Sequence, residues 1–130
     1  MSDIEASSNL SSQHQDFFVV GIGASAGGLK ALEEFFEHMP TNSNAAFVVI
    51  QHLSPDFKSL MKELLARRTP MAIYRVKEGM RLQPNSIYLI PPGKNLVLRN
   101  RQLHLLEQEA RNRYGLNLPI DIFLESLAQT

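Results

Sequence analysis

Short, uninterrupted apolar runs that alternate with helical segments are the feature that most constrains how this chain folds. The runs 17–22 and 46–50 contain only apolar residues and glycine, which is typical of strands buried on both faces of a sheet. Between them, apolar side chains recur at helical spacing, at Leu29, Leu32, Phe35 and Phe36. A strand, a helix and a second strand in this order predict two parallel strands joined by a right-handed crossover.

The same alternation continues through the middle of the chain. Apolar spacing predicts a second amphipathic helix over 56–68, and a third strand follows over 71–76. The fold class that this order predicts is α/β, with a doubly wound, mostly parallel sheet and helices on both of its faces.

The last third of the chain has a different pattern. A strand over 86–90 is stopped by two prolines and a glycine, and alternation over 96–99 and 103–106 predicts a β-hairpin. Leu118 and Pro119 then open a final amphipathic helix. The chain stops inside or just after that helix, which leaves a parallel sheet with few strands and an uncovered edge. We therefore expect that the C-terminal part of the domain is missing.

Composition limits both the architecture and the function. The polar first sixteen residues predict a disordered leader (1–16), followed by one α/β domain (17–130). Thirteen basic and thirteen acidic side chains cancel, so no net field favours nucleic acid or an anionic membrane. The absence of cysteine excludes disulfides, a thiolate nucleophile and cysteine-based zinc sites. With no apolar signal region and no run near the ~18 residues of a membrane span, we expect a cytoplasmic protein.

The glycine-rich turn after the first predicted strand carries the candidate chemistry, and three interpretations fit it. Gly21, Gly23 and Ala26 have the spacing of a dinucleotide-binding turn, in which small residues let a pyrophosphate approach the backbone. Gly23, Ser25 and Gly27 instead fit a nucleophile elbow, in which a tight turn presents a serine at the carboxyl edge of the sheet. The third interpretation is a turn that merely packs a helix against a strand. This motif alone does not choose among them.

The residue that follows the second strand favours the nucleophile elbow. His52 comes just past that strand, so parallel pairing brings it to the same sheet edge as Ser25. A neutral imidazole, with an ordinary pKa of about 6.5, can accept the serine proton. A dinucleotide site needs an acidic residue here to bind the ribose hydroxyls, whereas this chain has Gln51 and His52. We therefore predict Ser25 as a nucleophile and His52 as its general base, the alternative being a loop histidine without a catalytic role.

An esterase of this kind needs an oxyanion hole and a carboxylate that orients the histidine. The backbone N–H of Ala26 is the predicted oxyanion donor, and the start of the following helix adds partial positive charge. The four aspartates lie in or beside the leader or at the starts of predicted helices, and none is well placed to orient His52: Asp3, Asp16, Asp56 and Asp121. We expect the orienting carboxylate outside these residues.

Four segments together resemble the catalytic domain of bacterial chemotaxis protein-glutamate methylesterases, the CheB-type domain. They are residues 20–28, 51–55, 88–93 and 119–128, and the resemblance covers roughly residues 17–130. It implies hydrolysis of glutamyl methyl esters on chemoreceptors, release of methanol, and no cofactor or metal. It also implies that the family's serine falls on Ser25, its histidine on His52, and its aspartate beyond the last residue of this chain.

Three departures from the family pattern are visible. Ala26 stands where the family usually has threonine, Asn95 stands where many members have histidine, and sixteen leading residues cannot form a receiver domain. These features are similar to those of methylesterase domains fused ahead of a methyltransferase. The expected partners are a methylated chemoreceptor and a fused methyltransferase domain, with no nucleic acid and no membrane insertion. Two alternatives stay open: a nucleotide-binding α/β domain, and a sensory domain that keeps the fold and only docks partners.

Overall fold

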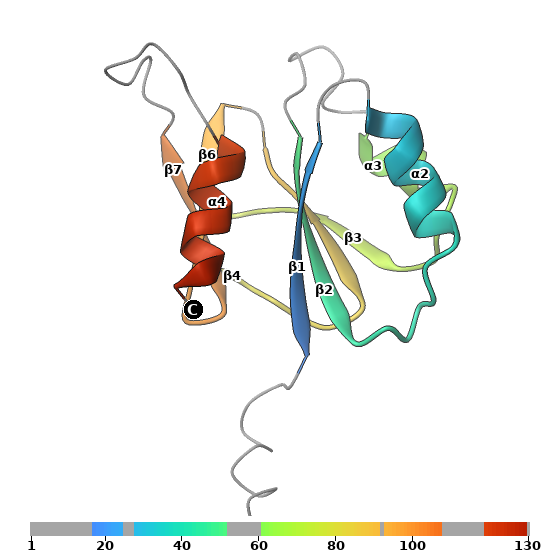
Figure 1. Ribbon diagram of the computed structural model, residues 1–130, viewed down its shortest axis with the longest axis horizontal. Coiled ribbons are helices and arrows are strands. Elements are labelled where there is room, and N and C mark those ends of the chain that lie inside the picture. Colours follow the sequence, from blue (N-terminus) through green and yellow to red (C-terminus); the bar gives the residue numbers. More distant parts are fainter. Residues whose placement is uncertain (1–16, 25–27, 52–60, 92, 108–118, 130) are drawn as a thin grey trace, which may run out of the picture.

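A parallel four-stranded sheet forms the centre of the molecule. The computed structural model describes residues 17–24, 28–51, 61–91, 93–107 and 119–129. The sheet has the order β1-β2-β5-β3, and every neighbouring pair is parallel. Its strands are β1 (Phe18–Ala24), β2 (Ala45–Gln51), β5 (Ser86–Leu89) and β3 (Ala72–Arg75). The parallel sheet predicted from the alternating pattern is therefore present (Figure 1).

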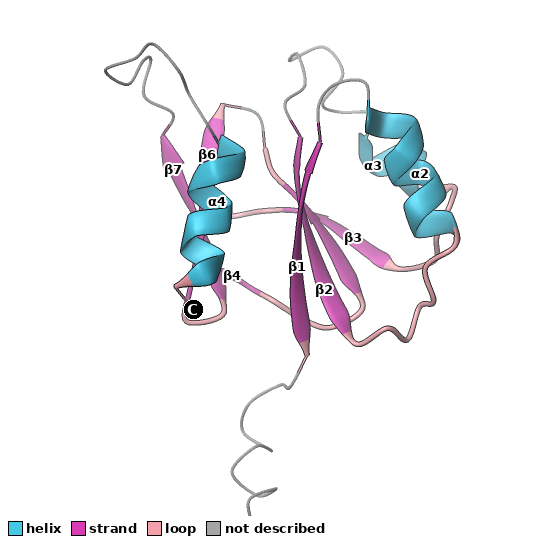
Figure 2. Cartoon of the chain, viewed as in Figure 1, coloured by secondary structure: helices cyan, strands magenta, loops and turns pink. Residues whose placement is uncertain are grey.

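Two helices cover one face of this sheet. They are α2 (Leu29–Glu37), which follows β1, and α3 (Met61–Ala66), which follows β2. The predicted second helix began at residue 56, but residues 52–60 lie outside the described part of the chain. Leu32 and Phe36 of α2 are buried against the sheet, in one core cluster with Phe47 and Val49 of β2. Figure 2 shows both helices on the same side of the strands.

A small antiparallel sheet and a third helix cover the opposite face. The small sheet has the order β4-β7-β6 and comprises β4 (Met80–Arg81), β7 (Gln102–Glu107) and β6 (Lys94–Arg99). Strands β6 and β7 form the predicted hairpin, with Asn100 and Arg101 at its turn in the left-handed conformation that a two-residue hairpin turn requires. Helix α4 (Pro119–Ala128) lies beside β6 and contacts β1 and β2.

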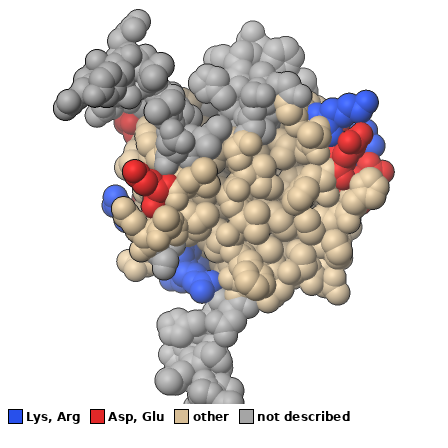
Figure 3. All heavy atoms as spheres, in the orientation of Figure 1, with Lys and Arg blue, Asp and Glu red and all other residues tan. Residues whose placement is uncertain are grey.

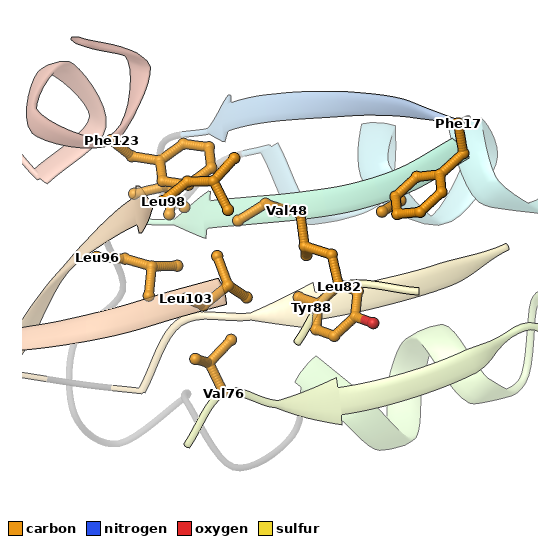
Figure 4. Packing of buried hydrophobic residues seen from close by; sticks show 11 residues of the cluster. Phe17, Val48, Val76, Leu82, Tyr88, Leu96, Leu98, Leu103 and Phe123 are labelled. Carbon is orange, nitrogen blue, oxygen red and sulfur yellow. The ribbon is translucent and has the colours of Figure 1, made fainter. Parts of the chain in front are cut away.

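The second core cluster fills the space between the two sheets. Leu96 and Leu98 of β6 and Leu103 of β7 point into it, together with Val48 of β2 and Phe123 of α4 (Figure 4). This cluster explains why β2 has the continuous apolar sequence that predicted burial on both faces: alternate residues face the two clusters.

Strand β5 lies inside the sheet and is buried along its whole length. Its two polar side chains, Ser86 and Tyr88, both form hydrogen bonds with residues nearby in the sequence. Ser86 donates a hydrogen bond from Oγ to the carbonyl oxygen of Pro84, at 3.2 Å, and the Tyr88 hydroxyl accepts one from the Gln83 N–H, at 2.7 Å. Burial raises the pKa of Tyr88, as expected for a phenol whose charged form loses hydration.

Candidate active site

The register of β1 and β2 determines what can meet at the carboxyl edge of the sheet. The two strands are parallel and pair without interruption from Phe18 with Ala45 to Ala24 with Gln51. Both strands end at this last pair. Neighbouring strands lie about 4.8 Å apart, so the chain leaves both strands at adjacent points of one edge.

The residues predicted to react come next in the sequence. Ser25 directly follows Ala24, and His52 directly follows Gln51. Ser25, Ala26 and His52 themselves lie outside the described residues. Their roles as nucleophile, oxyanion donor and general base therefore stay predictions, while the strand ends that precede them are adjacent.

Helix α2 begins at the same edge of the sheet (Figure 1). Its N-cap is Gly28, which has no side chain that could accept a hydrogen bond from the first-turn amides, and the first turn contains no acidic residue. The partial positive charge of this helix end is therefore not neutralised by a cap or by a carboxylate of the helix itself. Such an end stabilises negative charge that develops nearby.

The first glycine of the turn motif has a packing role. A Cβ atom at Gly21 would lie 3.1 Å from Phe123 Cε2, 3.1 Å from Leu124 Cδ2 and 3.5 Å from Leu127 Cδ2. Both 3.1 Å distances are shorter than ordinary van der Waals contacts. Glycine is thus needed at this position so that α4 can approach β1. This explanation needs no pyrophosphate, so Gly21 does not count in favour of the dinucleotide interpretation.

Asn95 is a buried polar residue near the same edge. It is the second residue of β6, which begins at the end of the molecule where β1 and β2 finish (Figure 1). Its relative exposure is 6%, and its Oδ1 atom has no hydrogen-bond partner within the described part of the chain. Burying an unsatisfied amide oxygen is unfavourable. From the sequence, Asn95 could be recognised only as a departure from a family pattern. Its burial could not be predicted, because burial depends on which elements pack over β6.

The other histidines and the aspartates do not build a second site in the described residues. His38 ends α2, with its Nδ1 atom 2.9 Å from the carbonyl oxygen of Glu34. His104 of β7 has its Nδ1 atom 2.7 Å from Glu78 Oε2. Asp121 belongs to α4, and the three other aspartates lie outside the described residues: Asp3, Asp16 and Asp56. The expectation that the orienting carboxylate for His52 lies outside this chain stays a prediction, because His52 is outside the described residues.

No group of three or more histidine, cysteine or acidic side chains in the described residues could hold a metal ion. None of the described helices is both long and apolar enough to cross a membrane.

A family comparison decides the assignment of the chain. The family model described as CheB methylesterase matches residues 20–130, which is most of the chain and includes both strand ends of the candidate site. The chain belongs to the CheB methylesterase family. The family that the four sequence segments suggested is therefore confirmed.

Full-length relatives of this CheB-family chain are considerably longer. A protein-glutamate methylesterase/protein-glutamine glutaminase of Bordetella avium is 31% identical over 127 residues, covering 97% of this chain and 36% of the relative. One of Syntrophomonas wolfei, with the same name, is 29% identical over 117 residues, covering 85% of this chain and 33% of the relative. The chain thus spans about a third of the length of these relatives.

A solved structure confirms the fold of the CheB-family chain. The CheB methylesterase catalytic domain of Thermotoga maritima superposes with a TM-score of 0.73 and is 24% identical in sequence. The match covers 88% of this chain and 61% of that one. The α/β fold class predicted from the alternating pattern is correct.

Proposed function

We propose that the protein is a protein-glutamate methylesterase acting on chemoreceptors, with Ser25 as nucleophile and His52 as general base. The observation that carries the proposal is the pairing of Ala24 with Gln51, because Ser25 and His52 directly follow these two residues. Family membership and the names of the relatives support the reaction class. The proposed protein partner is a methylated chemoreceptor, and a fused methyltransferase domain stays a prediction from the resemblance.

The proposed reaction has two acyl-transfer steps. The Ser25 hydroxyl oxygen attacks the ester carbonyl carbon while His52 takes the hydroxyl proton. The Ala26 N–H and the uncapped start of α2 stabilise the oxyanion. Collapse breaks the bond to the methoxy group, which leaves as methanol with the proton from His52. Water then attacks the glutamyl ester of Ser25, His52 accepts its proton and returns it to Ser25, and a free glutamate side chain is released.

The names of the relatives pair this activity with a glutaminase. An amide and a methyl ester of the same side chain form the same glutamyl intermediate on a serine, and differ only in releasing ammonia or methanol. We therefore include glutamine deamidation in the proposal. Both activities depend on the same Ser25 and His52.

The orienting carboxylate is proposed to lie beyond the 130 residues of this chain. In serine proteases, neutralising the corresponding aspartate lowers turnover by about 10⁴, or roughly 5 kcal/mol of barrier. The 130-residue chain should therefore release methanol from a methylated receptor weakly or not at all. A chain extended to the length of the relatives should be active.

The test is methanol release from methylated receptor by both chains at equal concentration. In the extended chain, Ser25→Ala and His52→Ala should each lower the rate by several orders of magnitude. The matched controls are Ser12→Ala and His14→Ala, which remove the same groups from the predicted leader and should leave the rate unchanged. Full activity of the 130-residue chain would show that the orienting carboxylate lies within these 130 residues.

The two alternatives give different results in the same series. An inactive extended chain that still binds receptor favours a docking domain. Saturable binding of NAD or FAD, detected as a rise in melting temperature, favours a nucleotide-binding domain. No binding of either dinucleotide is expected, because β2 ends at Gln51 and the next residue is a histidine, not an acid.

A further inference from the structure

Strand β5 ends beside the end of β2, on the side of β2 that faces away from β1. The two strands pair in parallel from Ala46 with Ser86 to Val49 with Leu89. Ile90 directly follows β5, and its N–H donates a hydrogen bond to the Val49 carbonyl oxygen at 3.3 Å. The order along the carboxyl edge of the sheet is therefore β1, β2 and then β5 with Ile90 at its end.

The Ile90 side chain lies at the boundary between the core and the carboxyl edge. It packs against the core cluster between the two sheets, on the face of the large sheet to which Tyr88 and Ile50 also contribute. Tyr88 is only 1% exposed, whereas Ile90, two residues later, is partly exposed. Exposure thus rises along β5 toward its carboxyl end, where Ile90 presents apolar surface at the edge of the candidate site.

The proposed ester hydrolysis, on which this inference rests, determines where the leaving group lies. The methoxy oxygen must come within hydrogen-bond reach of the His52 imidazole, because that group returns the proton to it. Ser25 follows β1 and His52 follows β2, so the methyl group is expected to lie beyond β2, on the side of β5. Ile90 is the partly exposed apolar side chain at the end of that strand.

An apolar wall at this point has consequences for specificity. A methyl group is stabilised by contact with apolar surface, whereas the NH₂ group of a glutamine side chain loses hydrogen bonds to water there. A wall formed by a β-branched side chain also limits the length of the alkyl group that fits. We propose that Ile90 forms the wall of the leaving-group pocket and is the residue that restricts the enzyme to small alkyl esters.

The test measures the size limit of this pocket in the chain extended to the length of the relatives. The substrates are two forms of one receptor fragment, with a γ-methyl or a γ-ethyl ester on the same glutamate. The readout is the ratio of kcat/KM for the ethyl ester to kcat/KM for the methyl ester. Ile90→Ala removes most of the wall and should raise this ratio by about ten-fold. A merely structural role would lower both values together and leave the ratio unchanged.

Two further variants complete the series. Ile90→Val removes a single methylene group, so it should raise the ratio less than Ile90→Ala does, and it decides the test when the alanine variant does not fold. Val19→Ala is the matched control, because Val19 is also partly exposed and packs against the same core cluster, but near the opposite end of β1. Figure 3 shows a mostly uncharged surface along β1 between α4 and α2, so this control disturbs no ion pair there. It should leave the ratio unchanged.

Two results would overturn the proposal while leaving the proposed function intact. The first is an unchanged ratio in the Ile90 variants that circular dichroism shows to be folded. The second is an equal rise in Val19→Ala, which would mean that a loosened core, and not the pocket wall, admits the ethyl group. An extended native chain that releases no methanol from the methyl ester would instead refute the proposed function, and the assignment of Ile90 would fail with it.

Discussion

At the scale of single residues, Gly21 allows a helix to approach a strand. A methyl group at this position meets two carbon atoms of α4 at 3.1 Å, one of them on the fully buried Phe123. Gly21→Ala should therefore destabilise the protein by about 1–2 kcal/mol through overpacking. The measurement is the free energy of unfolding in urea.

A double-mutant cycle identifies the contact responsible. The Leu124 side chain is 42% exposed and can be truncated at small cost. In a Leu124→Ala background, Gly21→Ala should be less destabilising, because one of the two close contacts is gone. Equal effects in the two backgrounds would mean that backbone conformation, and not the approach of α4, explains the glycine.

The residues of the candidate site differ in how far sequence alone could identify them. Ser25 and His52 could be proposed because each comes two or three residues after a continuous apolar run, and parallel strands finish at one edge. The burial of Asn95 could not be predicted, because the hairpin partner β7 pairs with only one edge of β6. What covers the side chains of β6 depends on tertiary packing, which the local sequence does not reveal. The packing role of Gly21 likewise requires knowing that α4, about a hundred residues later, lies against β1.

At the scale of elements, α4 protects the free edge of the small sheet. Strand β6 is the last strand of that sheet, and its Leu98 N–H donates a hydrogen bond to Ser126 Oγ of α4 at 3.0 Å. An unpaired strand edge is otherwise left to water or to another chain. Ser126→Ala should lower stability by about 1 kcal/mol or slightly less, since alanine regains some helix propensity.

Hydrogen exchange gives the sharper measurement of this contact. The Leu98 amide should exchange faster in Ser126→Ala, while the Gly79 amide, bonded to the Leu103 carbonyl oxygen, should not change beyond the global loss of stability. Ser126→Thr keeps the hydroxyl and should restore protection. Unchanged exchange at Leu98 in Ser126→Ala would show that the bond does not protect the edge.

The segment between β3 and β4 is tied to β7 through Glu78. Hydrogen bonding to His104, and then the N–H of Leu105, lower the pKa of the Glu78 carboxyl below its ordinary value of 4.5. A carboxyl with a lowered folded-state pKa stabilises the folded protein above its unfolded-state pKa, and this contribution disappears as the pH falls through the lower value. Glu78→Gln should thus destabilise the protein at neutral pH and have almost no effect on its stability in acid.

The check is the midpoint of urea unfolding for both proteins from pH 7 down to pH 3. Because the carboxyl is exposed, the difference at neutral pH should be small, and its convergence in acid is the informative result. Curves that stay parallel over the whole range would show that the charge of Glu78 is unimportant and that only its shape or hydrogen bonds matter.

Sequence patterns predicted the long elements well and missed the short one. The strands and helices with at least four patterned residues were found within a few residues of their ends in the described part of the chain. Strand β4 has only two residues and pairs with β7, about twenty residues later, so no local pattern could predict it. The place of β5 between β2 and β3 also depends on tertiary packing, since chain order alone does not specify it.

At the scale of the whole molecule, the outer edge of β1 is a place where a second chain can pair. Strand β1 is the terminal strand of the large sheet, and no described strand pairs with its outer edge. Its sequence contains no charge and no proline, and Phe18 at its start is 73% exposed. Strands of this kind readily pair with a second copy of the same chain, because natural edges are usually protected by lysine, proline or a covering element.

The 130-residue chain should therefore associate as its concentration rises, and Phe18→Lys should suppress that association by placing a charge on the edge of β1. The measurement is sedimentation velocity over a hundred-fold range of concentration. Leu106→Lys is the matched control: it removes another exposed large apolar side chain, on the central strand of the small sheet, and should leave association unchanged. A native chain that stays monomeric throughout, or equal suppression by both variants, would mean that the β1 edge is not where copies meet.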